Sequence, residues 1–246
     1  MKSSVKILFF VLFSPIAFGQ IPAEEQVDYL YKKHWYAGSS ISTNGLGFEG
    51  GLERNLSFKK HLFVTAYLGN LKNDKEIRRK NPIHENSKSY VFGKINSIVL
   101  SRLSIGYSYL LYEQRRKRGV SIQFKSSIGA SYAWIKPIYV KIKEPSIENI
   151  KKPFDERYNP EIHFPEIVFG RSSFFKGFNE GIGELGIHGR TGLAFDVSQK
   201  KNRILMVELG IQIDAYRKEI PVFYAGTNKK LYPGMYATVL LGINKF

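Results

Sequence analysis

Residues 120–134 read VSIQFKSSIGASYAW and alternate between two kinds of side chain. The even-numbered positions are mostly apolar, from Val120 through Phe124 and Ile128 to Trp134. The odd-numbered positions are small or polar, and Lys125 is the one charged residue among them. Because successive side chains of a strand point to opposite faces, this period of two predicts a β-strand with one apolar and one polar face.

The same alternation recurs in seven further segments, and no comparable helical period competes with it. It is clear in four of these segments and less regular at 34–43, 61–71 and 231–246. The predicted class is therefore all-β. The eight expected strands are 34–43, 46–53, 61–71, 95–112, 120–134, 185–197, 205–215 and 231–246.

The links between these strands are of two kinds. After the Asn44-Gly45 hairpin signal, short basic links alternate with long ones. Short turns at one end and long loops at the other are typical of outer-membrane barrels. The pattern predicts an eight-stranded antiparallel up-and-down transmembrane β-barrel with short periplasmic turns and long extracellular loops. The short links are 57–60, 113–118 and 198–202, and the long ones are 72–94, 144–181 and 217–230.

Alternation alone does not say which face points inward. A soluble, lipocalin-like barrel would place the apolar face inside. Here the polar face is rich in Gly and Ser between isolated charges, which suits the narrow interior of an eight-stranded barrel. This composition favours the membrane barrel.

The N-terminus resembles a secretion signal. Lys2 and Lys6 precede a short apolar run, and small residues at Ala17 and Gly19 would make Gln20 the first mature residue. An uncleaved anchor helix is the alternative, but the apolar run is shorter than the ~20 residues that span a bilayer. The expected organisation is a signal peptide at 1–19, a short periplasmic arm at 20–33 and an outer-membrane barrel at 34–246.

Composition narrows the partners. The chain has 246 residues, 37 Lys and Arg against 21 Asp and Glu, a net charge of +16 and no cysteine. The missing cysteine excludes disulfides, thiolate metal sites and a lipoprotein anchor. The positive balance suits nucleic acid or an anionic membrane, and export disfavours nucleic acid. We expect the outer membrane of a Gram-negative bacterium as location, its lipids as partners, and Phe246 as the terminal aromatic read by the barrel-assembly machinery.

Two short glycine-containing blocks carry a resemblance to a known group. One runs from Thr43-Asn44-Gly45 to Leu71-Lys72, and the other from Ser173-Phe174-Phe175 to the GIHGRTGL segment at 186–193. In these blocks the chain resembles a family of uncharacterised outer-membrane β-barrel proteins of Bacteroidetes-type bacteria. The resemblance implies fold and location, and it brings no reaction, ligand or functional residue.

The polar faces predict a charged network in the lumen. An eight-stranded lumen is filled by side chains, so charges inside it must pair. A structural ion-pair network is the expectation, and a proton path or narrow polar pore is the alternative. The predicted network is Glu49, Glu53, Arg102, Lys125, Glu184, His188, Arg190, Asp196, Glu208 and Asp214.

No catalytic, cofactor or metal site is predicted. His188 beside Glu184 or Glu208 could form an acid–base pair, but the nearby hydroxyl of Thr191 belongs to the opposite face. The other histidines lack metal-ligand spacing. The expected function is a non-enzymatic barrel that serves as envelope scaffold or as subunit of a larger assembly. A small conducting or transport barrel and a lipid-modifying enzyme are the alternatives.

Two long loops carry candidate contacts. The 72–94 loop is basic and could bind the phosphates of a surface glycolipid or be a solvated loop. The 144–181 loop holds four Phe within 169–178 and should either fold back over the barrel mouth or dock a protein partner or lipid. Its candidate contact patch is Phe169, Arg171, Phe174, Phe175, Lys176 and Phe178.

Overall fold

A computed structural model of the chain describes most of the expected barrel region. The expected signal peptide at 1–19, the expected arm up to residue 32 and the expected assembly signal Phe246 lie outside the described residues and stay predictions. Lys33, assigned to the arm, is the first residue of the first strand. The described residues are 33–73, 76–81, 87–113, 119–142, 153–198, 203–224 and 228–245.

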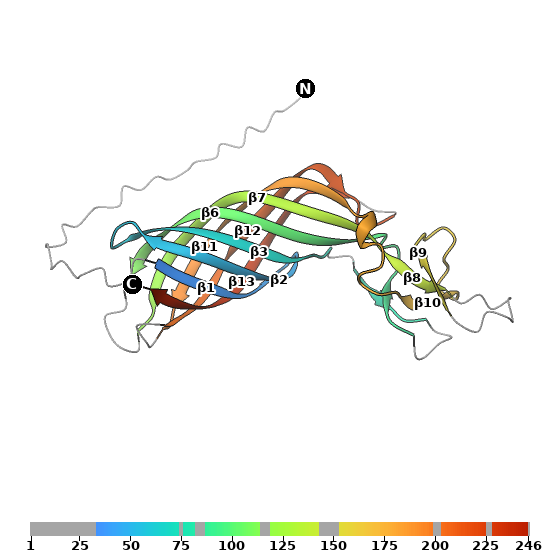
Figure 1. The fold of residues 1–246 in the computed structure, drawn as a ribbon, viewed down its shortest axis with the longest axis horizontal. Coiled ribbons are helices and arrows are strands. Elements are labelled where there is room, and N and C mark those ends of the chain that lie inside the picture. The colour runs from blue at the N-terminus through green and yellow to red at the C-terminus, as the bar shows by residue number, and fades with distance from the viewer. Residues whose placement is uncertain are drawn as a thin grey trace, which may run out of the picture.

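Eight long strands form one closed barrel (Figure 1). Spatial neighbours are neighbours along the chain and all pairs are antiparallel, so the predicted up-and-down order is confirmed. The last strand pairs with the first from Lys33–Lys245 to Ser42–Tyr236, which closes the sheet. In chain order the barrel strands are β1 (Lys33–Ser42), β2 (Gly45–Asn55), β3 (Lys60–Leu71), β6 (Asn96–Tyr112), β7 (Ser121–Pro137), β11 (Ile182–Asp196), β12 (Arg203–Ile220) and β13 (Lys229–Lys245).

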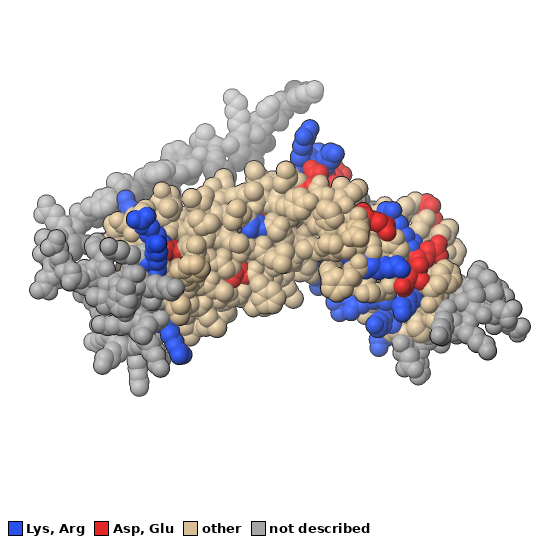
Figure 2. All heavy atoms as spheres, viewed as in Figure 1, with Lys and Arg blue, Asp and Glu red and all other residues tan. Residues whose placement is uncertain are grey.

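The apolar face of the strands points outward. On β6, Leu103 is 61% exposed while the adjacent Arg102 is 6% exposed. Figure 2 shows a barrel wall that is almost free of charge, with Lys and Arg gathered towards its two ends. An apolar outer wall suits hydrocarbon and not water, so the structure has the transmembrane and not the lipocalin-like arrangement.

Among the described residues, no helix has both the length and the apolar character to cross a membrane.

The two ends of the barrel differ as expected. We call them the short-turn end, where β2–β3, β6–β7 and β11–β12 connect, and the long-loop end, where the longer links lie. One predicted loop is shorter than expected, because β12 continues beyond residue 215 to Ile220 and β13 starts at Lys229. Tyr216 and Ile220 are buried, and their packing inside the long-loop end keeps the chain in strand conformation.

Two of the long links, 72–94 and 144–181, form a small subdomain at the long-loop end together with residues 139–142 (Figure 1). Its strands are β4 (Arg78–Arg79), β5 (Tyr90–Val91), β8 (Tyr139–Ile142), β9 (Phe154–Arg157) and β10 (Val168–Arg171). They form a two-stranded sheet, β4–β5, and a three-stranded sheet in the order β10–β8–β9. We call this unit the loop subdomain. The 3-10 turn η1 (Phe178–Glu180) links it to β11.

A core of its own holds the loop subdomain together. Val140 and Val168 are fully buried, and Tyr90, Ile142 and Tyr158 complete the cluster. The two loops are also joined by polar contacts. The buried Asn81 donates from Nδ2 to the carbonyl oxygen of Val168 at 2.7 Å. Gly170, at φ +143°, lets its backbone approach Lys88, where a Cβ would lie 2.4 Å from the carbonyl oxygen. Short strands with mixed patterns leave little signal in the sequence.

Tyrosine rings inside the barrel lie against glycines of neighbouring strands. The buried ring of Tyr36 on β1 covers Gly51 on β2, where a Cβ would lie 2.6 Å from two ring atoms. At the adjacent Gly50, which faces outward, the nearest atom would be 3.7 Å away. Small residues thus make room for large ones in the narrow lumen.

We therefore expect Gly51→Ala to lower the free energy of unfolding by about 1–3 kcal/mol, because the new methyl group overpacks the lumen. Gly50→Ala is the matched control and should change it by less than about 0.5 kcal/mol. Urea unfolding of both variants in lipid vesicles checks this. Equal destabilisation by the two variants would show that the Tyr36–Gly51 contact does not limit the packing.

Candidate functional site

The lumen brings together eight of the ten residues predicted for the polar network. They are Glu49, Glu53, Arg102, Lys125, His188, Arg190, Glu208 and Asp214. The other two lie outside the network at opposite ends of β11. Glu184 accepts a hydrogen bond from the backbone N–H of Lys218, and Asp196 accepts one from that of Ser198. The alternating pattern correctly predicted that both side chains belong to the inward face of the strand. It could not predict how far along the barrel axis each one lies.

Half of the network, nearer the short-turn end, is built around Lys125. Its Nζ lies 3.7 Å from a carboxylate oxygen of Glu53 and 3.7 Å from one of Glu208. Arg190 continues the chain, because its guanidinium pairs with Glu49 and also lies 2.9 Å from Glu208. These groups come from β2, β7, β11 and β12, so the network connects opposite walls of the barrel.

The other half of the network is centred on Asp214, which is fully buried. Arg102 donates to its two carboxylate oxygens, from Nε at 2.9 Å and from Nη2 at 2.6 Å. His188 Nδ1 lies 3.0 Å from one of the same oxygens. The guanidinium of Arg102 also stacks over the Tyr67 ring at 4.6 Å. A bidentate Arg–carboxylate pair of this kind has a defined geometry and holds β6 against β12.

Apolar side chains lie at each end of the polar network. Near the short-turn end, Tyr36 and Leu240 form a buried cluster with Ala194, Ile204 and Met206. At the long-loop end a larger cluster fills the lumen. Its buried members are Tyr67, Leu71, Ile98, Leu100, Ala133, Ile135, Tyr216, Ile220, Val222 and Tyr232.

The segment Pro221–Phe223 crosses the barrel mouth. It leaves β12 and reaches β6, which is not a neighbour of β12 in the barrel. The carbonyl oxygen of Val222 accepts hydrogen bonds from Ile95 N at 3.0 Å and Asn96 N at 3.3 Å, and Asn96 Nδ2 donates to Pro221 O at 2.7 Å. This segment covers the mouth. One alternative from the sequence placed 169–178 over the mouth instead.

This arrangement leaves little space for water or solute. Two cavities border the network, each of about 10 Å³, which is room for about one water molecule. Each carboxylate of the network lies within ion-pair distance of a basic side chain. The geometry matches a structural ion-pair network better than a polar pore.

Catalysis by the lumen residues finds no support in the geometry. His188 points inward to Asp214, whereas the Thr191 hydroxyl donates to the backbone carbonyl of Lys125 at 3.4 Å. The hydroxyl and the imidazole therefore do not form a nucleophile–base pair. Within the described ranges, no group of three His, Asp or Glu side chains could hold a metal ion.

Several network residues were missed in the sequence. His61 on β3 lies with Nδ1 3.1 Å from Glu53, and Ser108 donates to the same carboxylate at 3.0 Å. Tyr236 donates to Glu208 at 2.7 Å. His61 shares the inward face with Phe63 and Tyr67, so a phased reading of the irregular 61–71 segment could have found it.

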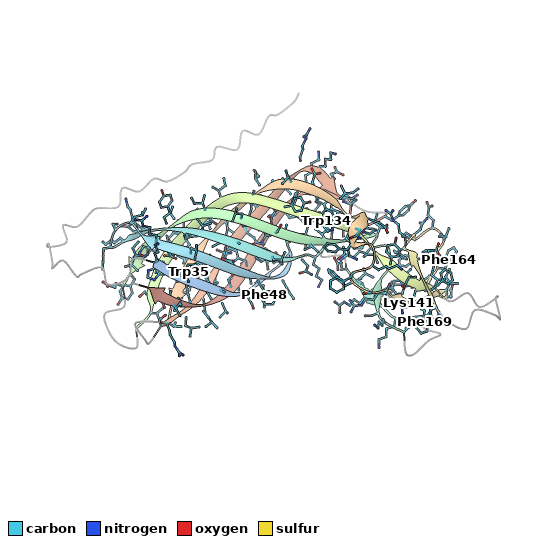
Figure 3. All side chains as sticks on the ribbon, viewed as in Figure 1. Trp35, Phe48, Trp134, Lys141, Phe164 and Phe169 are labelled. Carbon is cyan, nitrogen blue, oxygen red and sulfur yellow. The ribbon has the colours of Figure 1, made fainter. Side chains whose placement is uncertain are left out.

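A second candidate site is a cleft of about 850 Å³ between the loop subdomain and the barrel. Its barrel side is formed by the long-loop ends of β3, β6 and β7, and its other side by β5, β8 and the segment after β10. Figure 3 shows Trp134 where the barrel meets the loop subdomain, with Lys141 and Phe169 farther out. Six basic and two acidic side chains line this cleft among the residues described.

The structure describes all six residues of the predicted contact patch. Arg171, Phe174 and Phe178 line the cleft. Phe178 packs on Trp134 with ring centroids 6.0 Å apart, so this part of the segment lies against the outer face of β7. Lys176 pairs with Asp155 at 3.8 Å.

The other two residues of the patch differ in exposure. Phe175 is 78% exposed, and its ring meets that of Phe174 edge-on at 5.6 Å. Phe169 lies on β10 and is half-buried.

Three phenols of the cleft have raised pKa values, and for Tyr158 the cause is burial. Burial raises the pKa of Tyr90 to about 12. A hydrogen bond from Tyr139 to Glu180, at 2.6 Å, raises the pKa of the Tyr139 phenol. All three phenols are therefore neutral near neutral pH and add no negative charge to the cleft.

Comparisons with known proteins return distant barrels. No protein-family model and no curated protein matches the chain. Among solved structures it is similar to the attachment invasion locus protein Ail of Yersinia pestis, with 9% identity, TM-score 0.40 and coverage of 87% of this chain and 99% of that one.

Two further structures are similar to this chain. The N-terminal β-barrel domain of OprF from Pseudomonas aeruginosa has 9% identity and TM-score 0.37, over 87% of this chain and 98% of that one. Neisserial surface protein A has 8% identity and TM-score 0.37, over 87% and 94%. Likenesses at this level assign no function to the chain, and the expected Bacteroidetes-type family stays a prediction.

The Arg102–Asp214 pair yields a prediction. Asp214→Asn leaves the Arg102 charge buried without its counter-charge, so we expect the free energy of unfolding to fall by about 3–5 kcal/mol. The double variant Arg102→Met/Asp214→Asn removes both charges and should recover most of that loss. Urea titrations in detergent micelles measure both. A double variant as unstable as the single one would contradict the pairing as the cause.

Proposed function

We propose that this chain is a non-enzymatic β-barrel of the outer membrane of a Gram-negative bacterium, acting as an envelope scaffold or as a subunit of a larger outer-membrane assembly. The observation that carries the proposal is the contrast between the lumen and the loop subdomain. The lumen is filled by paired charges between apolar clusters, whereas the loop subdomain presents exposed side chains outside the barrel. A binding partner can therefore contact the loop subdomain, whereas the filled lumen offers no path for a solute.

The location within the envelope follows from the barrel type. Closed barrels with an apolar wall satisfy all backbone hydrogen bonds within hydrocarbon, and short turns with long loops are typical of the bacterial outer membrane. On this proposal the short-turn end faces the periplasm and the loop subdomain faces outward. The cleavable signal peptide, insertion by the barrel-assembly machinery through Phe246, and membership of the Bacteroidetes-type family are parts of the same proposal.

The two alternatives from the sequence have less support. A conducting barrel needs a continuous polar path, but apolar clusters flank the network and the Pro221–Phe223 segment crosses the mouth. A lipid-modifying enzyme needs a nucleophile beside a base, and Thr191 and His188 lie on opposite faces of β11.

A conductance measurement distinguishes a scaffold with a sealed lumen from a conducting channel. Purified protein inserted in a planar bilayer should give a conductance equal to that of the lipid alone, because the cavities of the network are each about one water in size. Stepwise single-channel openings from correctly folded protein would overturn the sealed-lumen view. Folding is checked in the same sample by the heat-dependent shift in electrophoretic mobility.

Photo-crosslinking in cells tests for an assembly partner. A photoreactive residue replacing Phe175, 78% exposed, should give a discrete adduct that contains a second protein. The control position is Ile128, 66% exposed on the outward face of β7, where lipid should surround the side chain and no protein adduct is expected. The absence of a protein adduct at Phe175, or identical adducts at both positions, would count against the assembly role.

A further inference from the structure

The cleft between barrel and loop subdomain lies at the boundary of the membrane-facing wall. Asn70 on β3 and Val99 on β6 line it and are paired with each other. The next outward residue of β3 towards the short-turn end is Leu68, 59% exposed, and on β6 the small residue Ser101 is followed by Leu103, 61% exposed. A molecule in the cleft therefore has the apolar wall directly beside it.

Among the described residues, basic side chains outnumber acidic ones in the cleft. Its acidic residues are already engaged, since Glu76 pairs with Lys94 at 2.5 Å and Asp155 with Lys176 at 3.8 Å. Across the ranges that the structure describes, the remaining basic residues have no carboxylate within 4.0 Å. They are Arg78, Lys88, Lys136, Lys141 and Arg171. Figure 2 shows Lys and Arg gathered over this end of the molecule.

Lys136 is the most informative of these residues. It occupies an outward position on β7, in a row that is otherwise apolar or small, yet it is only 3% exposed. Its Nζ donates to the carbonyl oxygens of Lys176 at 3.0 Å and Pro137 at 3.5 Å, and lies 5.1 Å from the centre of the Phe174 ring. A buried ammonium without a carboxylate is costly unless an anion compensates it. The missing counter-charge is what a bound anion would supply.

We propose that this cleft binds the phosphate groups of a phosphorylated membrane lipid, whose acyl chains lie along the adjoining apolar wall. Arg and Lys side chains are the usual partners of phosphate, and spaced cations suit a headgroup with more than one phosphate. The apolar flank favours a lipid over a soluble anion, because Phe174 and Phe178 line the cleft and Trp134 packs on Phe178. The inference rests on the membrane-spanning barrel and not on the assembly role.

Native mass spectrometry of the full chain, released from detergent micelles, measures the binding. The probes are diphosphorylated lipid A and the same lipid with both phosphates removed. We expect the phosphorylated form to bind the unaltered chain at least about tenfold more tightly, because each cation near a lipid phosphate contributes measurably to affinity. Equal binding of the two lipids would overturn the proposal.

Paired variants locate the binding in the cleft. Arg78→Gln/Arg171→Gln changes two exposed residues and should weaken binding of the diphosphorylated lipid about tenfold, whereas Arg78→Lys/Arg171→Lys keeps the charge and should retain most of it. The matched control, Arg54→Gln/Lys60→Gln at the short-turn end, should change binding by less than about twofold. If the control variant lost as much affinity for the lipid as the cleft variant, binding would depend on general surface charge and not on the cleft.

Competition distinguishes a lipid from a free anion. Inorganic pyrophosphate offers the phosphates without acyl chains, and it should displace the lipid only at a large excess. Displacement at equal concentration would show a site for soluble anions and overturn the lipid assignment. The crosslinking result at Phe175 reports on the assembly role separately, since Phe175 does not line the cleft.

Discussion

The pairing of β1 with β13 is the constraint on which the rest of the structure depends. A sheet with two free edges would expose unpaired backbone groups to hydrocarbon, and closure removes both edges. Closing a barrel of only eight strands makes the lumen narrow, so its side chains must interlock. The contact between the Tyr36 ring and Gly51 is one example of this interlocking. The charged network is a second example, because the narrow lumen brings charged side chains from opposite walls within ion-pair distance of each other.

The barrel and the lumen could be predicted from alternation because closure imposes that period on every strand. Lys125 is a lone charge in a row of small residues, and a lone inward charge implies a partner across the lumen. The height of a residue along the strand carries no comparable signal. Glu184 and Asp196 share the inward face with His188 and still lie outside the network, at the ends of β11.

The loop subdomain could not be predicted in the same way. Its strands have two to four residues, too few to show a period, and its core combines residues of the 72–94 and 144–181 loops with two residues of β8. The contact between Asn81 and Val168 joins residues that are far apart in the chain, and nothing local in either loop indicates the other. The cleft depends on this assembly. Lys136 reads in the sequence as an ordinary end-of-strand lysine, and only the packing of Phe174 over it reveals a buried charge.

The Pro221–Phe223 segment also has a mechanical consequence. By joining the chain that follows β12 to the start of β6 through hydrogen bonds, it acts as a brace across part of the mouth. Lateral pressure from the surrounding lipid tends to flatten a thin-walled cylinder, and a brace resists that change of cross-section at the end where it sits. Among the described residues, no such segment crosses the short-turn end, so we expect the rim beneath the loop subdomain to be the stiffer of the two. We expect this segment to hold the barrel side of the cleft, formed by the ends of β3, β6 and β7, in a constant shape.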